Sequence, residues 1–221
     1  MAKGLTLLFH FVAISSQLAA FYWMHLIGIL SLSMILKMFT LWTGCVQVIY
    51  FGLSLLEGLF GGNTKNQRSS NSILNDLFHL TLLMALATVS LFWSIYWLDP
   101  ENMVPKGMYY PDGLNHLHHT VPGILVLIEL ILVRSTSDVL HGIWKRKFYM
   151  VLCIPVAYLS FTGLSKHMKG YWPYPFMASW SFLEFGIFCV FAVILASILH
   201  YLIYLLIKLL KKPETVSLKS E

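Results

Sequence analysis

Residues 176–207 read FMASWSFLEFGIFCVFAVILASILHYLIYLLI and contain a single Asp, Glu, Lys or Arg, Glu184. A helix needs about 20 predominantly apolar residues to cross the hydrocarbon core of a bilayer, because it rises about 1.5 Å per residue. This stretch is long enough and apolar enough to do so. It therefore predicts a transmembrane helix.

Five further stretches have the same character, at roughly 5–24, 38–60, 77–98, 115–133 and 148–165. The whole chain is 57% apolar and 11% charged, with a mean hydropathy of +0.71, which is far from the composition of a soluble domain. We expect an all-α bundle of about six transmembrane helices that forms a single integral membrane domain over residues 1–221. Residues 25–36 are also apolar, so this connection is predicted to lie in the membrane interface or to extend a helix.

The basic residues predict the orientation of the bundle. Six crossings put both termini on one side, and eleven of the 15 Lys and Arg residues fall in segments on that side. The other side carries four, namely Lys37, Lys106, Lys166 and Lys169. Cytoplasmic segments of membrane proteins are enriched in Lys and Arg, so the termini are predicted to be cytoplasmic.

The basic residues also bear on possible partners. Because they lie in short runs beside apolar segments, the net charge of +5 does not indicate a nucleic-acid partner. The plasma membrane and the endoplasmic reticulum are equally compatible with the sequence, which does not identify protein partners.

A polar stripe runs along the second stretch. Its members are Thr40, Thr43, Gln47 and Ser54, whose spacings of 3, 4 and 7 residues are close to the period of a helix. The stripe is expected to face protein or a cavity rather than lipid. Ser and Thr commonly hydrogen-bond between membrane helices, so packing is the simplest explanation of the stripe taken alone.

A second polar cluster begins the fourth stretch, with three histidines in four residues: His116, His118 and His119. Asn115, His116 and His119 are spaced so that they could share one helix face, with His118 pointing elsewhere. The predicted topology places this cluster at the same membrane depth as Thr40. A hydroxyl and an imidazole at one depth are the minimum parts of a nucleophile and its general base.

Metal chemistry is the rival interpretation of the histidines, because imidazole is a good ligand for iron and zinc. A di-iron lipid desaturase needs several histidine boxes, and the other histidines here are scattered singly along the chain. We therefore predict neither a metal site nor a cofactor.

Two carboxylates and one aromatic segment complete the candidates. Glu129 and Glu184 are predicted to lie within the fourth and sixth helices, where a carboxylate needs a partner or a function. Structural hydrogen bonding and charge relay are both compatible with them. Residues 171–176 read YWPYPF, which predicts an aromatic belt at the membrane surface or a cap over the mouth of a lipid pocket.

Several of these motifs occur together, in order, in a known family. They are Phe39-Thr40-Leu41 with Gln47 and Tyr50, then Leu114-Asn115-His116 with His119-Thr120 and Glu129, and finally Trp172 with Tyr174-Pro175. On these residues the chain resembles the androgen-induced and androgen-dependent TFPI-regulating proteins, multi-pass membrane hydrolases of fatty acid esters of hydroxy fatty acids.

The resemblance implies a threonine-dependent carboxylic ester hydrolase that needs no cofactor. It assigns the nucleophile to Thr40 and the general base to His119, with Thr43 and His116 as nearby competitors. Asn115 and Gln47 are candidates for stabilising the oxyanion by polarity alone. The implied substrate is a lipid ester that reaches the site from the surrounding membrane lipids. The alternative is a regulator or scaffold without enzymatic activity that affects other proteins' expression or distribution.

Overall fold

The computed structural model describes residues 2–61, 72–104, 110–135 and 139–210. Within these ranges the chain is all helical, and six helices are long and apolar enough to cross a membrane. They are α1 (Lys3–Leu26), α3 (Phe39–Phe60), α5 (Ser72–Leu98), a composite fourth span (Asp112–Val133), α9 (Arg146–Lys169) and α10 (Phe182–Leu210). The prediction of an integral, multi-pass helical bundle is confirmed. Six basic residues used to predict the orientation lie outside the described residues: Lys65, Arg68, Lys106, Lys211, Lys212 and Lys219.

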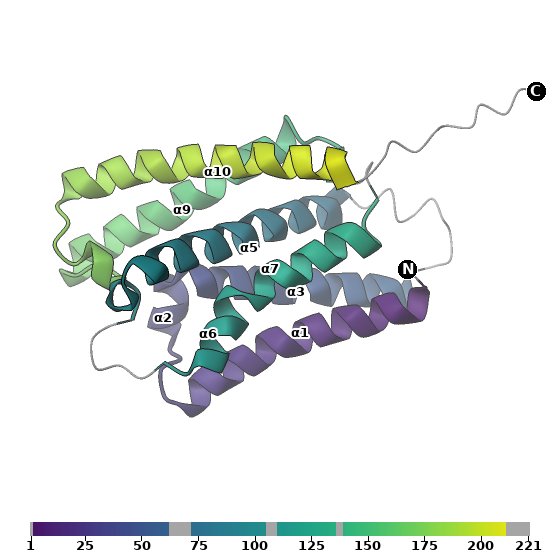
Figure 1. The fold of residues 1–221 in the computed structure, drawn as a ribbon, viewed down its shortest axis with the longest axis horizontal. Coiled ribbons are helices and arrows are strands. Elements are labelled where there is room, and N and C mark those ends of the chain that lie inside the picture. The colour runs from purple at the N-terminus through teal and green to yellow at the C-terminus, as the bar shows by residue number, and fades with distance from the viewer. Residues whose placement is uncertain (1, 62–71, 105–109, 136–138, 211–221) are drawn as a thin grey trace, which may run out of the picture.

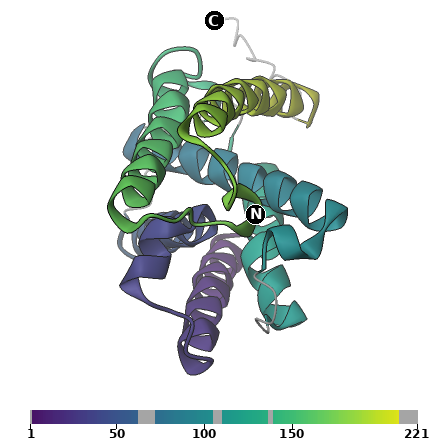
Figure 2. The ribbon, with the colours of Figure 1, turned by 90° about the vertical axis from the view of Figure 1, so that its left-hand side faces the viewer.

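The spanning helices run side by side along the long axis of the molecule (Figure 1). The start of α1 and the end of α10 lie at one end of the bundle, as six crossings require. Figure 2 looks onto the opposite end, where the short helix α2 (Leu32–Lys37) and the segment after α9 lie. We refer to this end as the loop end. It is the end at which α3 begins.

Large apolar side chains cover the outside of the bundle. Examples on four different helices are Leu8, Ile49, Val156 and Ile194, which are all exposed. In water such a surface would be highly unfavourable, whereas in a bilayer it contacts lipid chains of the same polarity. Helix α10 is the most peripheral, and only four of its residues are buried: Phe185, His200, Ile203 and Ile207.

Glycines allow the helices to approach closely. A Cβ atom at Gly58 of α3 would lie 2.6 Å from Leu7 of α1, and one at Gly123 would lie 2.8 Å from Val89 of α5. Small residues at such contacts increase the packed surface that holds membrane helices together.

The fourth span is divided into α6 (Asp112–His119), α7 (Val121–Ile128) and the π-helical turn η2 (Glu129–Val133). Pro122 explains the first break, because it lacks a backbone N–H and its ring clashes with the carbonyl group four residues earlier. The helix is therefore interrupted directly after His119.

Two predicted boundaries were wrong. Helix α5 begins at Ser72 rather than 77, and the last helix begins at Phe182 rather than 176. Pro175 begins a short 3-10 helix, η3 (Pro175–Met177), and Ser181 then precedes α10.

The predicted place of Glu184 was also wrong, because its side chain is exposed in the first turn of α10. Its carboxylate accepts hydrogen bonds from the backbone N–H of Ser181 at 2.6 Å and from the Ser181 hydroxyl at 2.8 Å. The Glu184 N–H lies 3.3 Å from the same hydroxyl, which completes a capping box. Glu184 therefore caps a helix and is not a carboxylate buried within the bundle.

Candidate functional site

Thr40 lies in the first turn of α3, at the loop end of the bundle. The start of this helix is held by two tyrosines. The N–H of Phe39 donates to the hydroxyl of Tyr174 at 3.0 Å, and the hydroxyl of Tyr158 donates to the carbonyl of Lys37 at 2.7 Å. Burial raises the pKa of the Tyr174 phenol, and its oxygen accepts the bond through a lone pair. These hydrogen bonds therefore hold the backbone that carries Thr40 in place.

His119 is the last residue of α6 and faces Thr40. Its Nδ1 atom lies 3.4 Å from Oγ1 of Thr40, and the two residues are 79 positions apart in the sequence. The imidazole stacks on the ring of Phe92 from α5, with centroids 3.5 Å apart and planes inclined by 6°. Three helices therefore meet at this contact, and the stacking limits rotation of the His119 ring. Thr40 remains partly accessible while His119 is buried.

Asn115 belongs to the same site, whereas His116 does not. Asn115 is buried one turn before His119, and its Oδ1 atom has no hydrogen-bond partner among the described residues. His116 is exposed, and its Nδ1 atom lies 3.0 Å from the hydroxyl of Thr120. The expectation that these three residues share a face therefore fails for His116, because it lies on the outer side of α6 beside Trp93. His118 points elsewhere, as predicted, and contacts Phe21 of α1.

The other members of the polar stripe on α3 are buried in helix contacts. Thr43 lies 2.8 Å from the hydroxyl of Thr88, and the amide nitrogen of Gln47 donates to the carbonyl of Pro122 at 2.9 Å. Ser54 is buried further along the same stripe. The stripe does face protein, and only its first member, Thr40, contacts His119.

Two cavities meet at Thr40. The first, with a cavity volume of about 120 Å³, lies between α3, α5, α9 and α10 and is lined almost wholly by apolar side chains. The second has a cavity volume of about 110 Å³ and contains His119, Asn115 and Tyr110 in its wall. Thr40, Phe92, Met103 and Tyr174 line both. The aromatic segment before α10 therefore lines the cavities through Tyr174, in addition to contributing the exposed ring of Tyr171.

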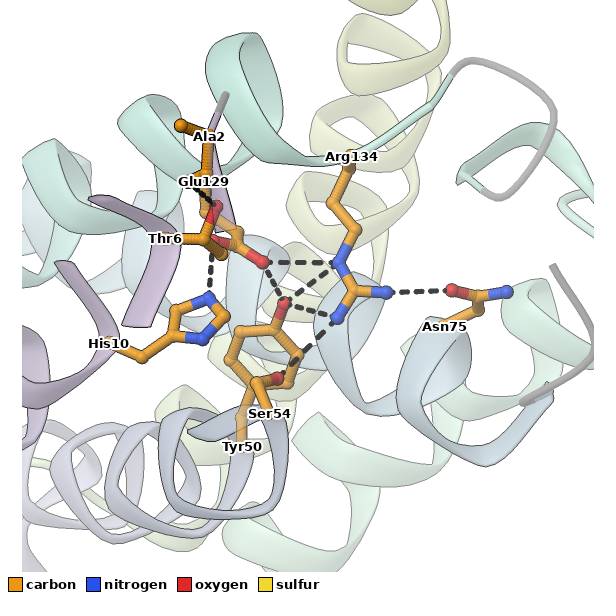
Figure 3. Close-up of polar contacts among 8 residues, drawn as sticks. All are labelled: Ala2, Thr6, His10, Tyr50, Ser54, Asn75, Glu129 and Arg134. Carbon is orange, nitrogen blue, oxygen red and sulfur yellow. Dashed lines mark hydrogen bonds and ion pairs between the residues drawn. The ribbon is translucent and has the colours of Figure 1, made fainter. Parts of the chain in front are cut away.

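Glu129 lies away from this site. It is ten residues from His119 along the fourth span, which corresponds to about 15 Å of helix. Its fully buried carboxylate contacts His10 Nε2 at 3.0 Å, the Tyr50 hydroxyl at 2.5 Å and Arg134 Nε at 3.1 Å (Figure 3). Arg134 also donates to Asn75 of α5 at 2.9 Å. We call this group the Glu129 network. It joins α1, α3, α5 and the fourth span, and none of its members lines either cavity.

A metal centre has no support in the described part of the chain, where no group of three or more His, Cys, Asp and Glu residues could hold an ion. Two histidines do contact each other, His79 and His200, whose ring nitrogens lie 3.0 Å apart between α5 and α10. These residues come from helices separated by 121 positions, so the sequence pattern did not indicate their contact.

Sequence reasoning missed Phe92 and Tyr158 at this site, and it named Tyr174 only as part of the aromatic segment and of a family motif, without its contact to the start of α3. Phe92 is an ordinary apolar residue of a long apolar stretch, and nothing in its spacing marks it as the partner of His119. Tyr174 offered a better signal, because a tyrosine beside a membrane helix often uses its hydroxyl for a specific contact, whereas Tyr158 lies in the middle of α9. Their shared role at the start of α3 depends on tertiary structure.

Comparison with known proteins places these features in a family. A family model described as FAR-17a/AIG1-like protein matches residues 5–212. The chain is 29% identical over 167 residues to the androgen-dependent TFPI-regulating protein of Mesocricetus auratus, covering 72% of this chain and 69% of that protein. It is 26% identical over 144 residues to the human androgen-induced gene 1 protein (Homo sapiens), covering 60% of this chain and 59% of that protein. No solved structure matches the chain. The resemblance inferred from the sequence is confirmed.

Proposed function

Because the chain belongs to the FAR-17a/AIG1-like family, we propose that it is a membrane-embedded hydrolase that cleaves fatty acid esters of hydroxy fatty acids. Thr40 is the nucleophile and His119 is the general base. The observation that carries the proposal is the 3.4 Å contact between Thr40 Oγ1 and His119 Nδ1 at the junction of two cavities. Catalytic hydrogen bonds are often long in the absence of substrate and shorten in the reactive complex.

The reaction is an acyl transfer in two steps. His119 Nδ1 takes the proton of the Thr40 hydroxyl as Oγ1 attacks the ester carbonyl carbon, and the same imidazole then protonates the departing alcohol oxygen. The products of this step are an acyl ester on Thr40 and the free hydroxy fatty acid. In the second step His119 removes a proton from water, the resulting hydroxide attacks the acyl group, and the fatty acid leaves while Thr40 regains its proton.

The negative oxygen formed in each step needs a hydrogen-bond donor. Asn115 is the better of the two candidates from the sequence, because its side chain lines the same cavity as Thr40 and His119. The amide nitrogen of Gln47 is already committed to the carbonyl of Pro122. Asn115 is therefore assigned to the oxyanion.

The surroundings of the pair favour a lipid substrate. Thr40 opens onto a wall of apolar side chains, and each methylene group transferred from water to such a wall contributes about 0.8 kcal/mol. A substrate that is already dissolved in the bilayer can reach this wall without crossing water. A small water-soluble ester would gain little from it.

The test is hydrolysis by membranes that contain the full chain. They are expected to release fatty acid and hydroxy fatty acid from a branched ester faster than membranes from cells carrying an empty vector. Hydroxylamine added during turnover should intercept the acyl group as a hydroxamate, because acyl-enzyme esters react with strong nucleophiles. Absence of both products would remove the hydrolase proposal and favour a regulator, the role that the name of the hamster relative gives to that protein.

The anchoring of α3 gives a separate prediction. Tyr174→Phe keeps the ring but removes the hydroxyl that accepts the Phe39 N–H, so Thr40 should lose its fixed position. One such bond contributes about 1 kcal/mol, and we expect a roughly fivefold fall in the hydrolysis rate per molecule. Tyr171→Phe is the matched control, because the exposed Tyr171 hydroxyl accepts only from Lys37 Nζ among the hydrogen bonds of the described residues. Equal rates for the two variants would argue against the anchoring role.

A further inference from the structure

The two cavities at Thr40 differ in one respect that bears on the reaction. Thr40 lines both, whereas His119 lines only the second. Thr40, the nucleophile, therefore faces both cavities, whereas His119, which acts as both base and acid, faces only the second. An ester consists of an acyl part and an alcohol part, which we call its two arms. The reaction requires one particular arm to lie beside His119.

That arm is the alcohol. His119 must donate a proton to the departing alcohol oxygen and must later activate water at the position the alcohol has left. The alcohol arm consequently belongs in the second cavity, beside His119 and the polar side chains of Asn115 and Tyr110. The acyl arm stays bonded to Thr40 between the two steps and needs a space that the alcohol and the water do not use.

On the basis of the function proposed above, we propose that the first cavity is the acyl-chain pocket and that its far end limits the length of the acyl chain. The residues of α5 that line it extend from Ile95, near the start of the pocket, to Leu83. These twelve positions correspond to about 18 Å of helix. One leaflet occupies about half of a hydrocarbon core of about 30 Å, so a pocket of this length accepts an entire membrane acyl chain.

Small and branched residues of α10 form the far end. Ala196 and Leu199 line the pocket and pack against the core cluster that contains Leu83. Directly beyond them, His79 of α5 and His200 of α10 are buried and contact each other at 3.0 Å, and neither lines the pocket, so we place its far end here. Ala196 is thus the position where added volume would shorten the pocket without touching Thr40 or His119.

Ala196→Phe tests the assignment. The assay uses one series of esters with a common alcohol and butanoyl, octanoyl or palmitoyl groups, and another with a common butanoyl group and alcohols of increasing length. We expect kcat/KM of the variant to fall about tenfold or more for the palmitoyl ester, because the added ring occupies space that the end of the long chain needs. The butanoyl ester and the whole alcohol series should be hydrolysed at the wild-type rate.

Ile194→Phe is the matched control, since it adds the same ring to the lipid-facing side of α10. It should leave both series unchanged.

A shift in the alcohol series instead of the acyl series would reverse the assignment, and an unchanged acyl profile in Ala196→Phe would overturn it. A wild-type protein that hydrolyses no ester in either series would contradict the proposed function itself. An equal loss with all esters would show that the substitution damages the fold, in which case Ala192→Leu, nearer the middle of the pocket, should still lower palmitoyl hydrolysis relative to butanoyl.

Discussion

Thr40→Ala is expected to abolish ester hydrolysis, with a loss of about a thousandfold or more, because no acyl-enzyme can form without the hydroxyl. His119→Ala should reduce the rate by about 100- to 10,000-fold, since the hydroxyl is then a weak nucleophile. The double variant should be no slower than the slower single one, because both residues act in the same step. The measurement is the release of fatty acid by membranes with matched amounts of each variant.

Thr43→Ala provides the control for Thr40. Thr43 lies one turn further along α3 and bonds to Thr88 rather than to His119, so its loss removes a helix contact of the same kind but leaves the catalytic contact intact. We expect near wild-type hydrolysis from Thr43→Ala. Thr40→Ser, which keeps a hydroxyl at the same place, should retain measurable activity. Full activity in Thr40→Ala would exclude Thr40 as the nucleophile, and its combination with loss of activity in Thr43→Ala would move that role to Thr43.

The number and type of the spanning elements could be predicted from the sequence because the bilayer imposes a simple rule. Any stretch of about 20 apolar residues must cross as a helix, since the backbone has no other hydrogen-bond partners there. The start of α5 was misplaced because Asn75 and Asp76 look too polar for a membrane helix. In the structure Arg134 donates to Asn75, and Arg146 pairs with Asp76 at 2.7 Å. Partners that lie far away in the sequence make these polar residues compatible with the helix.

The candidate site could be predicted only as far as membrane depth and helix periodicity reach. These two arguments brought Thr40 and His119 to one level, and the structure places them in contact. They could not separate His116 from Asn115, because the break at Pro122 and the rotation of α6 decide which side faces Thr40. The stacking of Phe92 on His119 and the division of the interior into two cavities depend on packing among helices. No pattern within a single helix contains that information.

Glu129→Gln is expected to destabilise the protein more than any other single substitution considered. The carboxylate is fully buried and is bonded to His10, Tyr50 and Arg134. The substitution keeps the side-chain volume but leaves Arg134 without its opposite charge. Breaking one partner of a buried ion pair costs about 3–5 kcal/mol, because the remaining charge is neither solvated nor paired.

Thermal unfolding in detergent measures this effect, and the comparison with a second carboxylate makes it specific. Glu184→Gln removes the same charge from an exposed helix cap, so its melting temperature should fall far less. Glu129→Gln combined with Arg134→Met should recover part of the lost stability, since the second change removes the uncompensated guanidinium.

Hydrolysis per folded molecule should stay at the wild-type level in Glu129→Gln, because the carboxylate lies about 15 Å along the helix from His119. A selective loss of hydrolysis without a fall in melting temperature would instead assign Glu129 to the reaction, so the two readouts together separate a carboxylate that holds four helices from one that relays charge.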